Sequence, residues 1–491
     1  MQRLHMTSVL AQVTSLAPAG RSLVPLGCGI RDFSSGARAD DSISRSAVLA
    51  SQFGGIAMVK LVMFALLGPI AWASNVVRAD DASQAPDGWQ RQAPRPDIAP
   101  RFRVQLSSAE TGPYQLGLAG RGSESVDGRW VRTVPVVASK HYSFRAEFRA
   151  EKVTNPARSI LARVLWLDGA GKQLDQAEYP LTSRDATKDG WSVVTSTYRA
   201  PAAASQARLE LHLRWSANGV VVWRRANLSE TNATVGRKVR LAAVNHRPRG
   251  SRSPQENLEQ FAKLIGEAAG HKADIVCLPE GITLVGTEKT YAEVAESIPG
   301  FSTGFLGEHA RKHRLYVVAG LYERDDKTIY NTSVLLDRNG KLVGKYRKVC
   351  LPREEIDGGI TPGKEYPVFS TDFGQIGMMI CWDVHFPEVA RELAARGAEV
   401  VLMPIWGGNE TLARARAIEN QVYLVASGYD FQTAIYDRAG QRTATTSKDP
   451  AVIVADVDLN ERLLWPWLGD WRARIWREGP ARNENNSSRR D

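Results

Sequence analysis

Cysteine is scarce in this chain. Only four of the 491 residues are cysteine, namely Cys28, Cys277, Cys350 and Cys381. No two of them form a C-x-x-C pair, so the sequence excludes the usual structural zinc sites, and we expect neither a metal nor another cofactor. Their spacing also differs from the framework of a disulfide-rich secreted domain. Each thiol is therefore either a buried apolar side chain or a reactive group.

Dense basic segments are also absent. Lys and Arg outnumber Asp and Glu by 63 to 53, which gives a formal net charge of +10. These basic residues are scattered, and no basic run is interleaved with aromatic residues in the manner of a nucleic-acid-binding segment. We therefore assign the excess charge to solvated surface and do not expect nucleic acid as a partner.

The apolar run at 61–73 is too short for a comfortable membrane span. It follows Lys60 and ends in an A-x-A arrangement at Ala71 and Ala73, and a second possible cleavage site follows Ala79. This is the layout of a secretory signal peptide.

Residues 58–79 are accordingly predicted to direct export to the periplasm or the extracellular space. Because signal peptides lie at the extreme N-terminus, we expect translation to start at Met58. Residues 1–57 are then a spurious or disordered extension. The alternative is a single anchor helix that stays uncut.

A linker rich in Pro and Asp at 80–101 leads into an all-β region, which we place at 102–232. Strand-length runs such as "YSFRAEFRAE" and "SILARVLWLD" are separated by Gly, Asp and Asn. Leu209, Leu211 and Leu213 alternate with polar residues, as in a half-buried strand. Seven or eight such runs with no helix signal predict a β-sandwich domain.

The pattern "DGRW", "YSFRAEFR" and "DGW…YRAP" resembles the jelly-roll domains that occur as carbohydrate-binding modules or galactose-binding-like folds. The resemblance implies a possible carbohydrate ligand. Core packing is the commoner role for tryptophan in such strands, and the alternation puts Trp215 on the apolar face of Leu213. The candidates for sugar stacking are Trp130, Trp166, Trp191, Trp215 and Trp223.

From 237 to 478 the pattern changes to alternating strands and helices, which predicts a layered α/β domain. Ser253 as N-cap, with Pro254 and Glu256 after it, begins a helix that Gly270 closes. Further helices are expected near 303–313, 386–396 and 409–421. The polar tail 479–491 is predicted to be disordered.

Three chemically active residues each follow a buried strand. Cys381 comes after the apolar run 376–380, Glu280 follows "DIVCLP", and Lys348 follows "GKYR". A thiol is a weak nucleophile at neutral pH until a base removes its proton, and a nearby carboxylate can accept that proton. An ammonium can then hold the negative charge that develops on a carbonyl oxygen. These residue types suffice for amide hydrolysis through an acyl-enzyme, without a metal.

The motifs "LPEG", "YRKVCLPREE", "GMMICWDVHFPEVAREL" and "ARARAIENQVYLV" resemble the carbon–nitrogen hydrolases of the nitrilase superfamily. The order Glu, Lys, Cys matches, as do the separations of about 68 and about 33 residues. The resemblance implies a four-layer αββα sandwich with Glu280 as general base, Lys348 as oxyanion stabiliser and Cys381 as nucleophile. It also implies a second glutamate. Of Glu354 and Glu355 we prefer Glu355, seven residues after the lysine.

Residues next to the cysteine are further candidates for the pocket. The resemblance makes the backbone N–H of Trp382 a second oxyanion donor. Asp383 either anchors the turn after the cysteine or caps the next helix. His385 either contacts substrate or packs as a surface group. Trp406, at another strand end, is expected to line the pocket.

The nucleophile motif reads Cys-Trp-Asp, which resembles amidases and N-carbamoyl amide hydrolases, whereas nitrilases usually read Cys-Trp-Glu. We therefore expect an exported hydrolase of a non-peptide linear amide or ureido compound that releases ammonia or an amine. The alternatives are a nitrilase, a catalytically silent binding protein that uses the β-sandwich, and an acyltransferase, which in this superfamily has a large membrane domain. The resemblance also implies a homo-oligomer.

Overall fold

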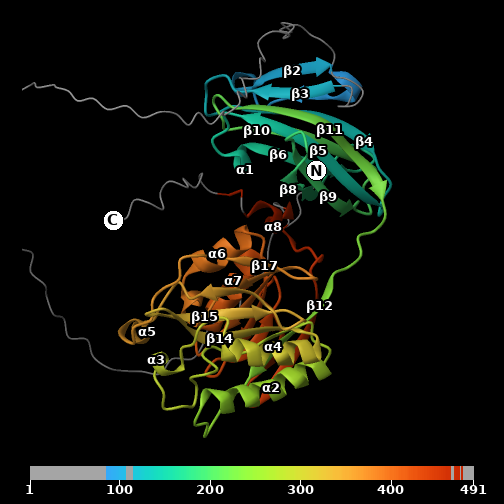
Figure 1. Cartoon of the computed structure of the whole chain (residues 1–491). Coiled ribbons are helices and arrows are strands. Elements are labelled where there is room, and N and C mark those ends of the chain that lie inside the picture. The colour runs from blue at the N-terminus through green and yellow to red at the C-terminus, as the bar shows by residue number, and fades with distance from the viewer. Residues whose placement is uncertain (1–84, 107–113, 466–468, 476, 479–491) are drawn as a thin grey trace, which may run out of the picture. The chain divides into compact units, whose positions relative to one another are not determined.

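The computed structural model describes residues 85–106, 114–465, 469–475 and 477–478. The extension 1–57, the signal segment 58–79 and the tail 479–491 lie outside these residues, so the corresponding expectations stay predictions. Among the described residues, no helix is long and apolar enough to cross a membrane. A β-sandwich comes first along the chain, and an α/β part follows it (Figure 1).

The sandwich consists of two antiparallel sheets, as the alternating strand runs predict. The first sheet has the order β1 (Gln90–Gln92), β4 (Asp127–Pro135), β10 (Gln206–Arg214), β6 (Ile160–Leu167) and β7 (Gln173–Glu178). The second has the order β2 (Arg101–Leu106), β3 (Tyr114–Ala119), β11 (Val220–Thr231), β5 (His141–Glu151), β9 (Ser192–Arg199) and β8 (Leu181–Ala186). One short helix, α1 (Pro156–Ser159), precedes β6 and was not expected from the sequence.

Tryptophan side chains fill the space between these sheets. Trp130, Trp166 and Trp223 are fully buried in one apolar core, and Trp191 is also buried. Core packing is therefore confirmed for the first three, and sugar stacking by these rings is ruled out. The prediction for Trp215 is wrong. Its φ of 54° ends the strand alternation, and its side chain is 42% exposed instead of sharing the face of Leu213.

The α/β part contains two six-stranded sheets. One has the order β16 (Leu342–Arg347), β15 (Thr328–Leu336), β14 (Tyr316–Asp325), β13 (Ile275–Cys277), β12 (Lys238–Asn245) and β23 (Ala451–Asp458). The other has the order β17 (Val368–Ser370), β18 (Gln375–Met378), β19 (Val400–Pro404), β20 (Tyr423–Ser427), β21 (Thr433–Tyr436) and β22 (Arg442–Thr446). In the first of these sheets β13 pairs in parallel with β12 and β14, and in the second β19 pairs in parallel with β18 and β20.

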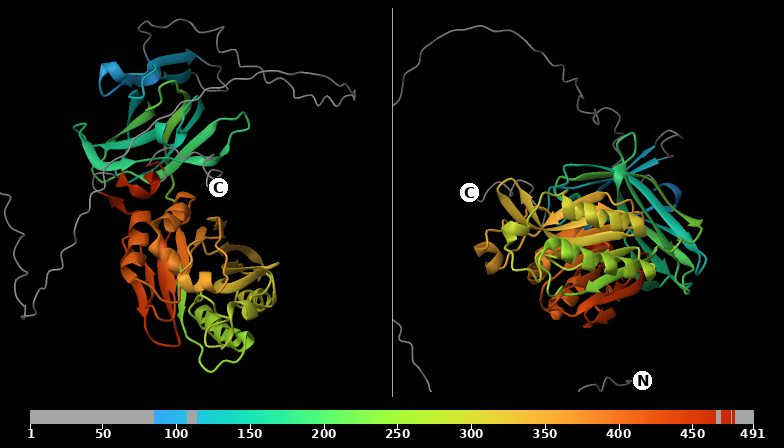
Figure 2. Two further views of the ribbon diagram at one scale, coloured as in Figure 1. Left: turned by 90° about the vertical axis from the view of Figure 1, so that its left-hand side faces the viewer. Right: turned by 60° about the horizontal axis from the view of Figure 1, so that its bottom comes forward.

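Strand β12 shows how these sheets are layered. Ala242 and Val244 pack with helices α2 (Pro254–Gly270) and α4 (Phe301–His313) on one face. Leu241 and Ala243 pack on the opposite face into the core that holds the second sheet and the helices α6 (Pro387–Ala395) and α7 (Glu410–Asn420). Helices therefore cover the outer faces and the two sheets face each other, which is the predicted αββα order. Figure 2 shows α2 and α4 side by side on one outer layer.

The helix signals in the sequence are borne out. Helix α2 begins after Ser253, whose Oγ accepts a hydrogen bond from the Glu256 N–H at 3.2 Å. Pro254 occupies the first turn, where its missing N–H costs nothing. The three helices expected near 303–313, 386–396 and 409–421 are α4, α6 and α7, whose ends lie within two residues of the predictions.

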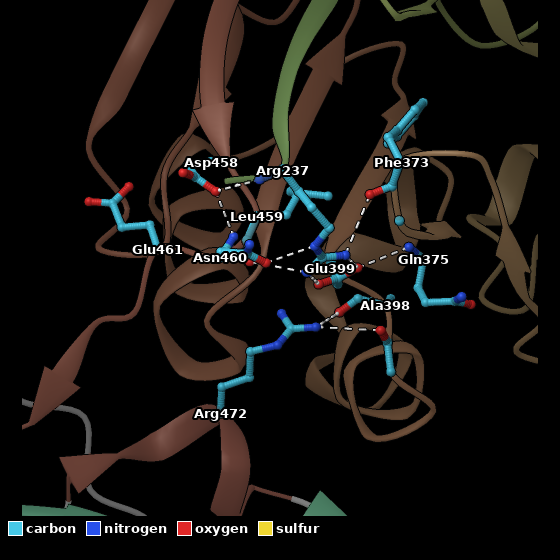
Figure 3. A network of polar contacts seen from close by, with 12 residues as sticks. Arg237, Phe373, Gln375, Ala398, Glu399, Asp458, Leu459, Asn460, Glu461 and Arg472 are labelled. Atoms are coloured by element: carbon cyan, nitrogen blue, oxygen red, sulfur yellow. Dashed lines mark hydrogen bonds and ion pairs between the residues drawn. The ribbon is translucent and has the colours of Figure 1, made fainter. Parts of the chain in front are cut away.

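Glu399 connects segments that are distant in sequence (Figure 3). Its two oxygens accept hydrogen bonds from Arg237 at 2.6 Å and 3.0 Å, and one of them also accepts from the Gln375 N–H at 3.1 Å. Arg237 also donates to the Leu459 carbonyl, and Arg472 donates to the Ala398 carbonyl beside Glu399. The network ties the start of β12 to the loop that precedes β19.

Replacing Glu399 with Gln should destabilise the chain by about 1–3 kcal/mol, because a mostly buried carboxylate that holds Arg237 is lost. Burial opposes the charge of Glu399, but the Arg237 hydrogen bonds lower its pKa below the ordinary 4.5. The stabilisation is therefore present above that pH and is lost as the pH falls through the lowered pKa. Urea unfolding at pH 7 and pH 3.5 measures both effects.

The matched control for Glu399 is Asp456→Asn, because Asp456 pairs with Arg240 at an exposed site. An exposed pair contributes only about 0–1 kcal/mol. Equal losses for the two variants at pH 7 would contradict the structural role given to Glu399.

Candidate active site

Segments from both sheets of the α/β part build one polar site. Glu280 lies just beyond β13, and Lys348 directly follows β16 of the same sheet. Cys381 begins a short 3-10 helix, Cys381–His385, just beyond β18 of the facing sheet. The strand-end placements expected from the sequence therefore hold for all three residues.

Lys348 lies between two carboxylates. Its Nζ donates to Glu280 Oε1 and to Glu355 Oε1, each at 2.9 Å. All three side chains are buried. Glu354 is exposed, so Glu355 is the member of "PREE" that reaches the lysine, as preferred from its spacing. Helix α5 (Arg353–Asp357) turns it inward.

Asn331 completes this cluster and was not predicted from the sequence. Its Nδ2 donates to Glu280 Oε1 at 2.7 Å and to Glu355 Oε1 at 2.6 Å, so it bridges the same two oxygens as Lys348. The Lys348 N–H donates to the Asn331 carbonyl at 2.8 Å, which fixes the two residues together. A fully buried amide within the strand "TIYNTSVLL" was the available signal, because such a group needs a polar partner.

One oxygen of each carboxylate is left over. Among the described residues, Glu280 Oε2 and Glu355 Oε2 are buried and have no hydrogen-bond partner. Burial raises the pKa of Glu355 to about 7, with Lys348 opposing the shift and Glu280 adding to it. Burial alone would lower the pKa of Lys348, but the charges of Glu280, an ionised Cys381 and Glu355 raise it. The lysine therefore stays an ammonium, and Glu280 keeps an open acceptor.

Cys381 sits in a strained turn beside this cluster. Its φ of 43° is unusual for a residue with a side chain, and such strain is often found at reactive sites. Its Sγ donates to the Gly407 carbonyl at 3.4 Å. Burial and the Glu280 carboxylate raise the pKa of the thiol to about 12, although Lys348 opposes them. Cys381 is therefore a protonated thiol at rest.

Asp383 holds the turn that carries Cys381. It is fully buried, and its carboxylate accepts hydrogen bonds from the Ile380 N–H, the Cys350 N–H and the Tyr346 hydroxyl at 2.7–2.9 Å. The N-cap residue of α6 is Phe386, so the turn-anchor interpretation of Asp383 is confirmed and the helix-cap interpretation is wrong.

The remaining candidates lie around the thiol. Trp406 immediately precedes Gly407, and its ring packs edge-on against Tyr429 at 5.1 Å. The Tyr429 hydroxyl donates to the Glu280 carbonyl at 2.9 Å, which links Trp406 and Tyr429 to the carboxylate cluster. The rings of Trp382 and His385 pack together with centroids 4.2 Å apart. His385 is thus a packed residue next to the site, and contact with substrate stays a prediction.

The part of the chain that the structure describes contains no group of three or more His, Cys, Asp or Glu side chains arranged as metal ligands. In the cluster of Glu280, Lys348 and Glu355, the cation that both carboxylates contact is the lysine ammonium.

Comparison with known proteins matches residues 240–466 to the carbon–nitrogen hydrolase family model. Omega-amidase NIT2 of Xenopus tropicalis is 34% identical over 233 residues, which cover 42% of this chain and 83% of that protein. The human omega-amidase NIT2 is 32% identical over 235 residues, which cover 42% of this chain and 84% of the relative. The matched residues belong to the α/β part.

Two solved structures are also similar to part of this chain. Nit3 of Saccharomyces cerevisiae, a member of the nitrilase superfamily, aligns with a TM-score of 0.42 at 28% identity and covers 45% of this chain and 90% of its own. A mutant of the amidase from Nesterenkonia sp. AN1 aligns with a TM-score of 0.40 at 26% identity, over 45% of this chain and 93% of its own.

The high pKa of Cys381 makes a prediction about its reactivity. Because the thiolate is the reacting form, modification of Cys381 by methyl methanethiosulfonate should rise about tenfold per pH unit between pH 7 and pH 10, with no plateau. Mass spectrometry of the peptide that contains Cys381 measures the rate, and the same peptide in urea provides the unperturbed thiol. An inflection below pH 8 in the folded protein would contradict the assignment of a protonated resting thiol.

Proposed function

This chain belongs to the carbon–nitrogen hydrolase family and is an enzyme that acts on amides, and we propose that it cleaves a small linear amide or carbamoyl compound through an acyl-enzyme on Cys381. The observation that carries the mechanism is the arrangement around Lys348. The Lys348 ammonium is bonded to Glu280 and Glu355. In the described part of the chain, the second oxygen of Glu280 is buried without a partner, and the Glu280 charge raises the pKa of the Cys381 thiol.

In the first half of the proposed reaction, Glu280 Oε2 accepts the proton of the Cys381 thiol as Sγ attacks the carbonyl carbon of the amide. Negative charge develops on the carbonyl oxygen, where the Lys348 ammonium and the Trp382 N–H stabilise it. The C–N bond then breaks, and Glu280 returns the proton to the departing nitrogen. Ammonia or an amine leaves, and a thioester remains on Cys381.

Water completes the reaction. Glu280 removes a proton from a water molecule that attacks the thioester carbonyl, and the same two donors stabilise the second oxyanion. Collapse of that intermediate breaks the C–S bond and expels the thiolate, which recovers its proton from Glu280. Glu355 and Asn331 are assigned to positioning, because Glu355 accepts from the Lys348 ammonium and Asn331 donates to Glu280.

The amide preference rests on sequence and relatives together. The Cys-Trp-Asp motif at Cys381 resembles amidases, and the relatives reported above are omega-amidases. We propose an ω-amide or a ureido acid as the class of substrate to test first, with nitriles as the competing class. Release of ammonia from a panel of these three classes separates the possibilities.

Three further parts of the proposal concern the rest of the protein. We propose export through the segment 58–79, which N-terminal sequencing of the mature protein tests. We propose a homo-oligomer, which sedimentation in solution tests.

We also propose that the β-sandwich is a jelly-roll of the carbohydrate-binding kind, supported by its two antiparallel sheets and by the exposed ring of Trp215.

Replacing Cys381 with Ala should lower amide turnover by at least about 10⁴-fold, because the nucleophile of the proposed mechanism is removed. The parent enzyme should show an acyl mass increase on the Cys381 peptide when quenched during turnover, and the variant should not. Cys277→Ala is the matched control, since that thiol is buried in the core between the sheets. Ammonia release by Cys381→Ala at the parent rate would exclude the mechanism.

Replacing Asn331 with Ala should lower kcat by roughly 10²-fold through misplacement of Glu280 and Lys348. The hydrogen bond from Asn331 favours the ionised form of Glu355 and so lowers the pKa of that group. Loss of this hydrogen bond should raise the pKa of Glu355 and so move the acidic limb of the kcat/KM profile to higher pH. Ser333→Ala, a buried polar change on the same strand, is the control, and identical pH profiles for both variants would reduce Asn331 to a purely structural role.

A further inference from the structure

One face of the first sheet of the sandwich carries charged side chains next to Leu161 and Leu165, which pack with Ala473. Along β10, which is labelled in Figure 1, the core positions hold Ala207, Leu209, Leu211 and Leu213. The alternate positions therefore place Arg208, Glu210, His212 and Arg214 on the opposite face. This surface, called the arginine face below, belongs to the part of the chain outside the matched enzyme region 240–466.

Strand register extends the charged set to the neighbouring strands. Glu210 lies opposite Arg163 of β6, and His212 lies opposite Arg129 of β4. At the end of the same strands, Arg214 lies opposite Asp127. Directly opposed residues share one face of a sheet, so these side chains converge.

The arginine face carries more positive than negative charge. Glu210 is bonded to Arg163 at 2.5–2.7 Å, and two further guanidinium groups, those of Arg208 and Arg129, approach it only at 3.5 Å and 3.6 Å. Burial lowers the pKa of His212 to about 4, even though Glu210 opposes the shift, so the imidazole is neutral at pH 7. With Arg214 and Asp127 included, four guanidinium groups face two carboxylates.

Buried polar atoms on this face lack partners. Within the described residues, His212 Nδ1, Arg208 Nε and Asp127 Oδ1 make no hydrogen bond, although buried polar atoms are nearly always paired. The side chain of His212 is only 3% exposed. Its Nε2 contacts the Glu210 carboxylate at 3.0 Å and must be the donor there, since an ionised carboxylate only accepts. Nδ1 of the neutral ring is therefore an acceptor without a donor.

The second sheet of the sandwich provides an internal contrast. There, buried Glu147 is bonded to both Arg145 and Arg224 at 2.8 Å, and Arg224 is also bonded to Asp189 at 2.8 Å. In the described part of the chain, none of these four side chains has a buried polar atom without a partner. The buried glutamate and its arginines on the second sheet thus have their hydrogen bonds complete. The corresponding group on the first sheet has buried polar atoms without partners.

The missing partners specify a ligand of mixed chemistry. Guanidinium groups that outnumber their carboxylates would bind the carboxylates of a ligand, in a planar, bidentate geometry. His212 Nδ1 and Asp127 Oδ1 are acceptors and would instead accept hydrogen bonds from hydroxyl groups. The exposed ring of Trp215, on which Arg214 stacks at 4.2 Å, stands at the end of the same strand. Carboxylates and hydroxyls occur together on a sugar acid.

We propose that the arginine face binds an acidic saccharide of the uronate type. Its carboxylates lie against Arg129 and Arg208, and its hydroxyls donate to His212 and Asp127. The side chains of Arg129 and Arg208 remain 20% and 29% exposed and contact Glu210 only at long distance. Arg129 also donates to Gln92 at 2.9 Å and Arg208 to Gln173 at 3.1 Å, and the carboxylates of the ligand would replace these two exposed hydrogen bonds. This inference rests on the proposed carbohydrate-binding role of the sandwich and is independent of the amidase site.

Isothermal titration of the full chain with trigalacturonate, with the neutral galactose trisaccharide and with acetate tests the proposal. Trigalacturonate should bind, and the double change Arg129→Gln with Arg208→Gln should weaken it by about tenfold or more, because charge-assisted hydrogen bonds are lost. Arg145→Gln on the other sheet is the matched control and should leave binding unchanged. Thermal melting and amide hydrolysis verify that each variant is folded, and Arg208→Gln alone replaces the double variant if that does not fold.

The outcomes are distinguishable. Binding of the neutral trisaccharide without binding of trigalacturonate overturns the acidic class but keeps the carbohydrate role. Failure of both saccharides to bind overturns both. Equal binding of acetate, or an affinity for trigalacturonate that the Arg129 and Arg208 changes leave intact, also overturns the proposal.

Discussion

A single buried ammonium, that of Lys348, lies between the carboxylates of Glu280 and Glu355, and the geometry of the site depends on this contact. Buried charges are costly unless each is paired and hydrogen-bonded, so removal of Lys348 would leave buried carboxylates without a counter-ion. Asn331 supplies the second bond to each carboxylate oxygen and makes the cluster rigid. The surrounding fold is built to keep these groups in register. A Cβ at Gly320, for example, would lie 2.6 Å from the Glu280 Cα.

The charge balance of this cluster explains the state of the thiol. With a pKa of about 7, Glu355 holds a proton for part of the time near neutral pH, and the lysine is then balanced by Glu280 alone. The Glu280 carboxylate and burial together raise the pKa of the Cys381 thiol. In the proposed mechanism the thiolate therefore forms only as it attacks, because the proton moves to Glu280 in the same event.

The sequence alone was sufficient for the layered α/β architecture, because buried strands and capped helices such as α2 leave local signals. The strand-end positions of Glu280, Lys348 and Cys381 were likewise visible as polar residues after apolar runs. Asn331 was not predicted, because its partners are known only once β15 pairs with β16 and places it beside Lys348. Trp215 was misplaced, since strand alternation says nothing about a residue that leaves the strand with positive φ.

The last constraint is that Cys381 and the pair of Glu280 and Lys348 come from different sheets. Glu280 and Lys348 follow strands of one sheet, whereas Cys381 follows β18 of the other, so any sliding between the sheets would separate them. Asp383 opposes this motion. Its carboxylate binds Tyr346 and the Cys350 N–H, which lie two residues before and two residues after Lys348. The turn that carries the thiol is therefore bonded to the segment that carries the ammonium, and the distance between Cys381 and Lys348 is set by this short connection instead of by the packing of the whole core.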